Sequence, residues 1–206
     1  LYPISWTEFE NNAGYLKAQQ QLELRIVYGM YPDVINNLGD EKEILKQLTD
    51  SYLYKDILSY GGIRKPELLE KLLRALAFQI GSEVSYNELS QLLGIDKKTV
   101  SNYIDLLCQA FVIFKLPSFS KNLRNEIKTN QKIYFYDTGV RNMIIGDLNP
   151  LEVRQDKSNL WENFLIAERL KYNAYTNSLA KSYFWRTVQQ QEIDYVEENA
   201  GIVTGI

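Results

Sequence analysis

The sequence predicts an α+β protein that is mainly α-helical, and three observations carry this prediction. Apolar residues recur at helical spacing between residues 40 and 109, and two β-branched and aromatic runs follow them. A further helical pattern then leads into two more strand-like runs near the end of the chain. With 206 residues, 45% of them hydrophobic and 24% charged, the chain can form one large or two small domains, and two are favoured.

The first part of the chain is predicted to be a helical lead-in. Its opening stretch, LYPISWTEFE, is apolar and strand-like, with no capping residue expected ahead of it. A helix is predicted from about Asp40 to Tyr60, because apolar residues recur there at near-helical spacing and the paired glycines of SYGGI follow.

Three amphipathic helices are predicted next. Leucines at helical spacing follow Pro66, and Gly81 is expected to stop that helix. The stretch SYNELSQLLGI begins with Ser85 and has Glu88 three residues later, which is the pattern of a capping box. The following helix begins at Asp96 after a short glycine-containing turn, so this pair predicts a helix-turn-helix.

The strand-like runs FVIFKLP and KIYFYDT, separated by a polar and basic stretch, resemble the wing of a winged helix. If this unit binds DNA, the start of the second helix would approach the major groove with Lys97, Lys98, Thr99, Ser101 and Asn102. The wing would meet phosphates with Lys115, Lys121, Arg124, Lys128 and Lys132. Acidic residues dilute this basic patch, so docking of a protein partner is left open as the alternative.

Composition excludes several functions. The net charge of −3 and the pI near 5.2 restrict any DNA contact to a local patch. The absence of histidine excludes Ser-His-Asp, Cys-His and His-ligated metal chemistry, and the single Cys108 cannot form an internal disulfide. No P-loop motif is present. Without a signal-like start or a membrane-spanning apolar run, the chain is predicted to be cytoplasmic and to have no membrane partner.

The last part of the chain has a helical pattern from Asn159 onward, and the strand-like runs SYFWRT and EIDYVEE follow it. This order of a helix and then strands predicts a second, small α/β domain.

Several phrases together resemble a known family, among them YPDVI, KIYFYDTGV, LWENFLIAERL and YFWRT followed by EIDYV. In this order they resemble the C-terminal half of prokaryotic AAA-type ATP-binding proteins, catalogued as domain of unknown function 4143. The resemblance implies an ATPase module N-terminal to Leu1, and a C-terminal domain similar to PD-(D/E)XK nucleases. The expected segments are a helical lead-in over 1–64, a winged helix-turn-helix over 65–150, and the start of a nuclease-like α/β domain over 151–206.

In nucleases of that type, acidic side chains and a lysine surround one or two divalent cations that activate water for phosphodiester hydrolysis. By this resemblance Glu162 would match the acid of the first helix and Asp194 the strand aspartate, and both would bind the metal. Glu192 would lie on the same strand face as Asp194, because side chains alternate along a strand. These three residues are the candidate catalytic set, with Mg²⁺ as the possible metal.

The candidate set is incomplete, because the strand that should carry the second acid and the lysine would begin at GIVTGI. No lysine follows Asp194, so the 206 residues alone are not expected to cleave DNA. The alternative interpretation makes Glu162 a helix residue favoured by the helix dipole, and makes the two strand acids protection for a sheet edge.

The function predicted from the sequence is therefore that of a recognition and regulatory region of a P-loop ATPase, binding DNA or a partner protein through its winged helix. One alternative is a Mg²⁺-dependent nuclease whose remaining catalytic strand lies beyond Ile206, and another is a structural oligomerisation module. No cofactor or nucleotide is expected in this chain itself, because ATP and Mg²⁺ belong to the implied ATPase module. The expected partners are DNA, that ATPase module, another protein or further copies of the chain.

Overall fold

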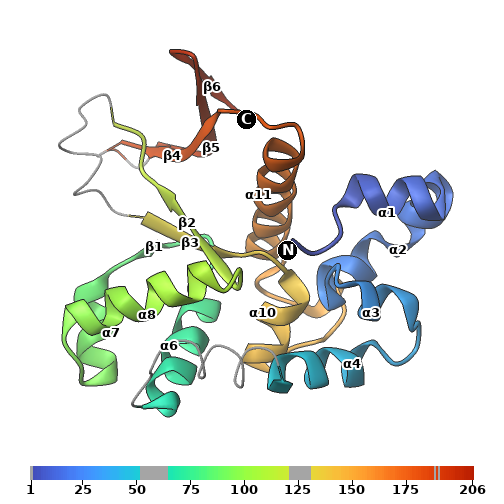
Figure 1. The fold of residues 1–206 in the computed structure, drawn as a ribbon, viewed down its shortest axis with the longest axis horizontal. Coiled ribbons are helices and arrows are strands. Elements are labelled where there is room, and N and C mark those ends of the chain that lie inside the picture. Colours follow the sequence, from blue (N-terminus) through green and yellow to red (C-terminus); the bar gives the residue numbers. More distant parts are fainter. Residues whose placement is uncertain (1, 52–64, 121–130, 188, 190) are drawn as a thin grey trace.

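A computed structural model describes residues 2–51, 65–120, 131–187, 189 and 191–206. Within these ranges the chain forms nine α-helices and two three-stranded antiparallel sheets (Figure 1). The protein is thus α+β and mainly helical, as the sequence predicts. No helix in the described ranges is long and apolar enough to cross a membrane.

The described part of the lead-in, residues 2–51, contains four helices: α1 (Trp6–Ala13), α2 (Tyr15–Tyr28), α3 (Pro32–Asn36) and α4 (Glu41–Leu48). The prediction of an uncapped, strand-like opening is wrong. The hydroxyl of Ser5 accepts a hydrogen bond from the backbone of Glu8, whose carboxylate accepts one from the backbone of Ser5. This reciprocal capping box starts α1 at the S-x-x-E pattern inside the apolar stretch. Helix α4 is the described part of the helix predicted over residues 40–60, and residues 52–60 lie outside the described ranges.

The middle of the chain forms α6 (Pro66–Phe78), β1 (Glu83–Val84), α7 (Tyr86–Leu93), α8 (Lys97–Gln109), β2 (Ile113–Pro117) and β3 (Gln131–Phe135). The strands pair antiparallel in the order β1-β3-β2. Ser85 and Asp96 cap α7 and α8 as predicted, each accepting a hydrogen bond from a backbone N–H three residues on. Gly94 takes the left-handed conformation, with φ of 64°, in the turn between the two helices.

Helix α10 (Thr138–Ile145) is an element that the sequence analysis misses, because the strand-like run KIYFYDT includes the start of this helix. The strand ends at Phe135, and buried Asp137 caps the helix by accepting hydrogen bonds from the backbones of Val140 and Met30. A Cβ at Gly139 would lie 2.1 Å from the carbonyl oxygen of Tyr28. Only glycine permits this close approach, so the DTG sequence holds α10 against the end of α2.

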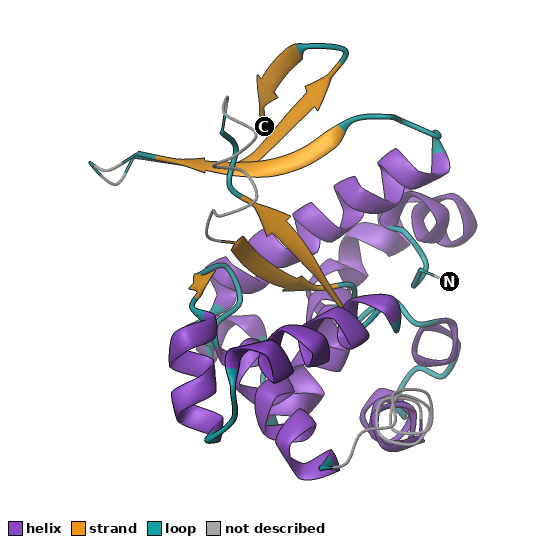
Figure 2. Cartoon of the chain, turned by 60° about the vertical axis from the view of Figure 1, so that its left-hand side comes forward, coloured by secondary structure: helices purple, strands orange, loops and turns teal. Residues whose placement is uncertain are grey.

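The C-terminal part begins with the short 3₁₀ helix η2 (Leu151–Val153) and the long helix α11 (Lys157–Tyr175). The strands β4 (Lys181–Arg186), β5 (Glu192–Asn199) and β6 (Ile202–Gly205) follow, in the sheet order β4-β5-β6. The two sheets meet where Ser118, just after β2, forms a parallel bridge with Phe184 of β4. The backbone of Phe119 also donates to the carbonyl of Phe184 over 2.7 Å. Figure 2 shows the second sheet projecting beyond the helical body.

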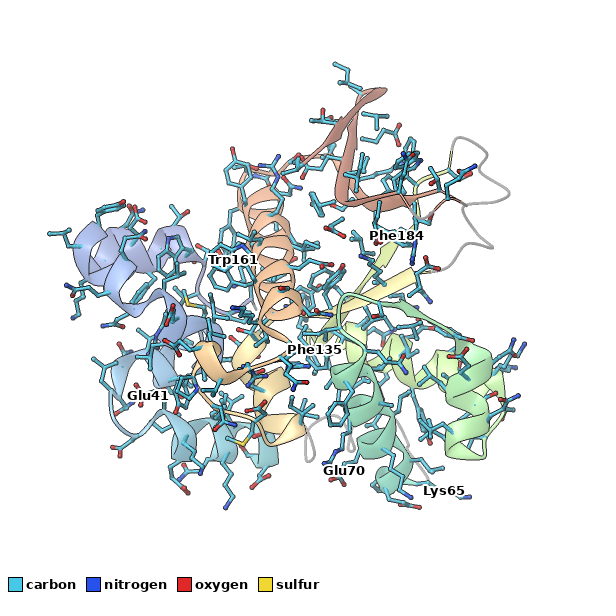
Figure 3. All side chains as sticks on the ribbon, turned by 180° about the vertical axis from the view of Figure 1, so that it is seen from behind. Glu41, Lys65, Glu70, Phe135, Trp161 and Phe184 are labelled. Atoms are coloured by element: carbon cyan, nitrogen blue, oxygen red, sulfur yellow. The ribbon has the colours of Figure 1, made fainter. Side chains whose placement is uncertain are left out.

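Two groups of buried apolar side chains hold these elements together. The larger one joins residues from Phe9 to Phe164 and includes Phe135 at the centre of the molecule (Figure 3). The smaller one lies at the junction of the two sheets and α11, and includes Phe184. It consists of Phe114, Leu116, Tyr134, Ile166, Ala167, Phe184 and Tyr195. The smaller core therefore packs the middle unit against the C-terminal strands, at the place where the candidate site lies.

Candidate functional site

Five polar side chains from three elements meet beside the smaller core, and we call them the Lys132 cluster. They are Lys132 and Tyr134 of β3, Glu162 of α11, and Glu192 and Asp194 of β5. The Nζ atom of Lys132 lies 2.6 Å from Glu192 Oε1, 3.2 Å from Asp194 Oδ1 and 3.3 Å from Glu162 Oε1. The hydroxyl of Tyr134 donates to Glu162 Oε1 over 2.5 Å.

The strand period explains why these residues share one site. Lys132 and Tyr134 lie two residues apart on β3, as Glu192 and Asp194 do on β5, so each pair projects from a single face of its strand. Glu162 lies in the second turn of α11, on the side that faces β3. The apolar part of the lysine lies against the sheet junction, and its Nζ atom is 5.5 Å from the ring centroid of Phe184.

The cluster is buried at its lysine and open at its acids. The side chain of Lys132 is 3% exposed, those of Glu162 and Glu192 are 24% and 26% exposed, and that of Asp194 is 56% exposed. Solvent therefore reaches the cluster from the side of Asp194.

The pKa shifts follow from this placement. Burial lowers the pKa of Lys132, but the hydrogen bond to Glu192 and the nearby carboxylates outweigh it, so the pKa lies above the usual lysine value. Burial raises the pKa of Glu162, and the opposing effects of Tyr134 and Lys132 do not cancel this rise. Burial beside the Glu162 carboxylate also raises the pKa of Tyr134, so its phenol stays a hydrogen-bond donor.

The rim of the cluster carries a second cation. Arg186 of β4 pairs with Glu83 of β1 over 3.2 Å and approaches Glu192 with an Nε–Oε2 distance of 3.8 Å. Gly81 covers the other side, where an added Cβ would lie 3.4 Å from the carboxylate of Glu162. The turn between α6 and β1 thus closes over the acid of α11.

The structure brings together all three candidate acids: Glu162 and Asp194, which the resemblance matches, and Glu192, which the strand alternation adds. It also adds Lys132, for which the predicted phosphate contact is wrong, because the ammonium group is buried among carboxylates. A sequence signal for this role exists: a lysine inside the apolar run KIYFY is expected to be buried, and a buried lysine needs acidic partners.

Carboxylate oxygens are suitable ligands for a hard divalent cation such as Mg²⁺. The point where the three acids converge, however, is taken by the Lys132 ammonium group, whose positive charge opposes a second cation there. In the described ranges, no group of three or more acidic, cysteine or histidine side chains is arranged to hold a metal ion. In this arrangement the residues present do not fit the metal that the resemblance implies.

The predicted DNA-contacting residues of α8 lie on a different surface. Lys97, Lys98 and Asn102 are exposed, and Ser101 is partly exposed. The hydroxyl of Thr99 donates to the carboxylate of Asp96 over 2.7 Å and so belongs to the helix cap. Of the predicted wing residues, Lys115 forms an ion pair with Asp105, while Lys121, Arg124 and Lys128 lie outside the described ranges.

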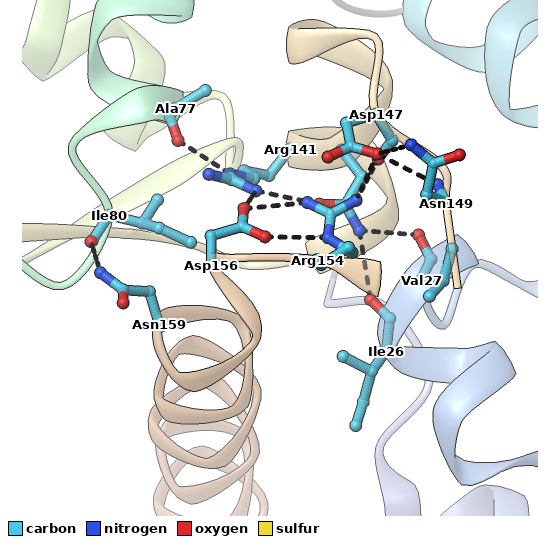
Figure 4. A network of polar contacts seen from close by, with 11 residues as sticks. Ile26, Val27, Ala77, Ile80, Arg141, Asp147, Asn149, Arg154, Asp156 and Asn159 are labelled. Carbon is cyan, nitrogen blue, oxygen red and sulfur yellow. Dashed lines mark hydrogen bonds and ion pairs between the residues drawn. The ribbon is translucent and has the colours of Figure 1, made fainter. Parts of the chain in front are cut away.

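A second polar group, which we call the Arg141 cluster, lies where α10, η2 and the start of α11 meet (Figure 4). Its members are Arg141, Asn142, Asp147, Arg154 and Asp156. Arg141 donates to the carbonyl of Ala77 at the end of α6 over 2.8 Å, and Asn142 donates to the carbonyl of Val27 at the end of α2 over 2.8 Å. These side chains satisfy helix carbonyls that have no partner within their own helices. The Arg141 cluster therefore ties the lead-in and the middle unit to α11.

The fold and the candidate site define the chain as a mainly helical α+β region with an acidic cluster at a sheet junction. It belongs to the family described as "Domain of unknown function (DUF8612)", whose model matches residues 19–151. Residues 157–206 match the model of a second family, "Domain of unknown function (DUF4143)". The latter is the family that the sequence analysis names for the whole chain, and its model covers the C-terminal part.

Relatives of this chain are found in bacteria and archaea. An uncharacterised protein of Haemophilus influenzae is 27% identical over 213 residues, which is 97% of this chain and 50% of that protein. The uncharacterised protein Rv2008c of Mycobacterium tuberculosis is 29% identical over 73% of this chain and 34% of its own length. The uncharacterised protein MJ1544 of Methanocaldococcus jannaschii is 24% identical over 83% of this chain and 38% of its own length.

The chain thus spans half or less of the length of these relatives, and it matches their C-terminal portions. No solved structure matches it with significance.

Proposed function

We propose that this chain is the DNA-recognition region of a longer, cytoplasmic ATP-dependent protein, and that α8 enters the major groove of duplex DNA. The observation that carries the proposal is the exposed, lysine-bearing start of α8 within a winged-helix order of elements. A helix, a short strand, two helices and two further strands, paired in the order β1-β3-β2, are the arrangement of a winged helix.

The orientation of α8 supports this role. Val100, Ile104 and Leu107 are buried and fix the inner face of the helix. Lys97, Lys98 and Asn102 lie on the outer face, where lysine can meet phosphates and asparagine can read an adenine edge. Asp96 caps the helix and does not reverse the positive charge of its first turn, because two lysines follow it directly.

The longer relatives support the second half of the proposal. They leave room for the ATPase module that the resemblance implies, and the chain would then couple the nucleotide state of that module to DNA. Docking of a protein on α8, hydrolysis at the acidic cluster and oligomerisation stay predictions.

Binding of the 206-residue chain to a fluorescently labelled DNA duplex, measured by anisotropy across a salt series, tests the proposal. We expect micromolar affinity that weakens steeply with salt, because each lysine at a phosphate releases about one counterion. The double variant Lys97→Glu/Lys98→Glu should lose binding at moderate salt, and its residual salt slope should fall by about two.

The matched control is Lys42→Glu/Lys46→Glu, which reverses two exposed lysines on α4 and changes the net charge equally. This control should bind DNA almost as the parent chain does. Equal losses in the two double variants, or no binding at low salt, would contradict a specific role for α8.

A further inference from the structure

We propose that an exposed apolar stripe on α11 is the surface against which the longer protein packs the part of its chain that precedes Leu1. The stripe consists of Trp161, Leu165, Tyr172 and Tyr175. Their exposed fractions are 43%, 47%, 54% and 49%. The proposal rests on one part of the proposed function, that the chain is a region of a longer protein, and it does not require DNA binding by α8.

The stripe is one continuous face of the helix. Its four residues fall within about 80° of one another around the helix axis, because an α-helix has about 3.6 residues per turn. On one flank Phe164 packs against Trp6 of α1, with ring centroids 6.1 Å apart. On the other flank Glu162 faces β3 and belongs to the Lys132 cluster. The stripe therefore lies between the lead-in and the Lys132 cluster and overlaps with neither.

Helix α11 is apolar on both of its faces. The inner face buries Leu160, Phe164 and Ile166, and the outer face carries the stripe. An ordinary surface helix has one apolar and one polar face, whereas a helix that is apolar all round is normally covered all round. Tryptophan and tyrosine, which make up most of the stripe, are also the residue types that anchor protein interfaces. The composition of the outer face thus indicates a surface that another part of a protein covers.

Residues 2–6, which we call the N-terminal strap, lie beside the stripe. The ring centroid of Tyr2 is 6.1 Å from that of Tyr175, at the C-terminal end of α11. One turn earlier on the helix, the Nζ atom of Lys171 donates to the carbonyl of Ile4 over 3.1 Å. The strap therefore runs antiparallel to α11, and Figure 1 shows the N-terminal end of the chain beside this helix.

The strap is anchored by buried contacts. The carboxylate of Glu168 accepts a hydrogen bond from the backbone N–H of Trp6 over 2.6 Å and another from the buried Lys171 over 2.7 Å. This anchoring fixes the position of Tyr2 against the end of the stripe. Because each further residue spans at most about 3.6 Å, chain that precedes Leu1 starts within a few residues of the stripe.

The relatives indicate which occupant fits this geometry. Half of the Haemophilus influenzae protein lies outside the matched part, and the chain matches its C-terminal portion. A unit joined directly to the strap meets the stripe at an effective concentration of about a millimolar, which a free partner or a second copy would have to exceed. The preceding part of the same longer protein is therefore the favoured occupant.

The test is hydroxyl-radical footprinting, read by mass spectrometry, of the 206-residue chain and of the full-length protein that contains it. The stripe should be oxidised readily in the 206-residue chain and about tenfold more slowly in the full-length protein, because a packed interface excludes water from its apolar anchors. Phe78 of α6 and Leu92 of α7, which are 60% and 68% exposed, should react alike in both proteins.

A double variant of the full-length protein, Trp161→Ser/Leu165→Ser, removes half of the stripe. It should restore oxidation of Tyr172 and Tyr175 to the rate seen in the 206-residue chain. The matched control, Phe78→Ser/Leu92→Ser, removes two exposed apolar side chains elsewhere and should leave the protection unchanged.

The DNA-binding variant Lys97→Glu/Lys98→Glu should also leave the stripe protected, so failure of docking and failure of DNA binding are distinguishable. Equal oxidation of the stripe in the two unaltered proteins would overturn the proposal, and this comparison needs no variant to fold. Protection that appears in the 206-residue chain as it dimerises, measured by sedimentation at rising concentration, would overturn it as well, because a second copy would then cover the stripe.

Discussion

The Arg141 cluster and the Lys132 cluster differ in their balance of charge. The Arg141 cluster has two guanidinium groups and two carboxylates, and the side chains of Arg141 and Arg154 are 2% and 0% exposed. The Lys132 cluster has one ammonium group for three carboxylates, and its acids are open to solvent. Both lie where elements distant in the sequence meet.

The clusters also differ in how completely each buried charge is paired. The nitrogen atoms of the Arg141 cluster bond to helix carbonyls and to Asp156, so each desolvated charge has a partner. The Lys132 cluster retains excess negative charge, and burial raises the pKa of Glu162 although Tyr134 and Lys132 act to lower it. The balanced cluster is therefore expected to stabilise the fold more than the unbalanced one does.

The largest effect is expected from breaking the balanced cluster. Arg141→Met should lower the free energy of unfolding by about 4 kcal/mol, because it leaves Asp156 with fewer partners and the carbonyl of Ala77 with none from this side chain. Urea unfolding followed by circular dichroism measures this loss.

The control is Arg74→Met on α6, where the arginine is exposed and lies over the ring of Phe78. This substitution should lower the free energy of unfolding by less than about 1 kcal/mol. Similar costs at the two arginines would contradict the structural role of the Arg141 cluster.

An intermediate loss of stability is expected at Glu197. This residue forms a balanced ion pair with Arg169 at the edge of the smaller core. Hydrogen bonds from Arg169 and Asn173 lower the pKa of Glu197 to about 2, from a usual value of 4.5. Because the folded-state pKa is lowered, the stabilisation is present above pH 4.5 and is lost as the pH falls towards 2. At neutral pH, Glu197→Gln should lower the free energy of unfolding by about 2 kcal/mol, since solvent screens the partly exposed Arg169 and weakens the ion pair.

Unfolding curves at several pH values measure this effect. The difference in free energy of unfolding between the parent and the variant should disappear at acidic pH. Glu198→Gln, one position along β5 and on its other face, is the control and should show little change. A difference in free energy of unfolding that does not depend on pH would mean that lost packing, and not the lost carboxylate charge, destabilises the variant.

The smallest loss of stability is expected at the Lys132 cluster, whose charges are unbalanced. Lys132→Met should lower the free energy of unfolding by only about 1 kcal/mol, because the partly exposed acids can regain water and a buried ammonium no longer has to be desolvated. A double-mutant cycle with Glu192→Gln would measure the coupling of the closest pair. A loss as large as that of Arg141→Met would make the two clusters alike.

Local patterns in the sequence predict much of the fold. The caps at Ser85 and Asp96, the helix after Pro66 and the long C-terminal helix all form where the patterns place them. Helix α10 is missed because its first residues continue a strand-like run, and the helix is short. The capping box at Ser5 is not predicted because it consists of only two polar residues, which lie inside an apolar stretch.

The candidate site is predicted in part. A resemblance selects Glu162 and Asp194, the strand alternation adds Glu192, and the structure brings the three together. The partner, Lys132, lies 30 residues from Glu162 and 62 from Asp194 along the chain, so no local pattern connects them. Its assignment to a solvent-facing wing fails because the junction with β4 and β5 covers that side of β3.

By itself the sequence determined several of the helices, because hydrophobic periodicity, caps and glycines act over a few residues. It also limited the classes of chemistry available, since a chain without histidine has no imidazole to act as a base or a metal ligand. Only the tertiary structure decided which charges meet. The sheet junction buries Lys132 beside three acids from two other elements, because β3, β5 and α11 pack together only in the folded chain.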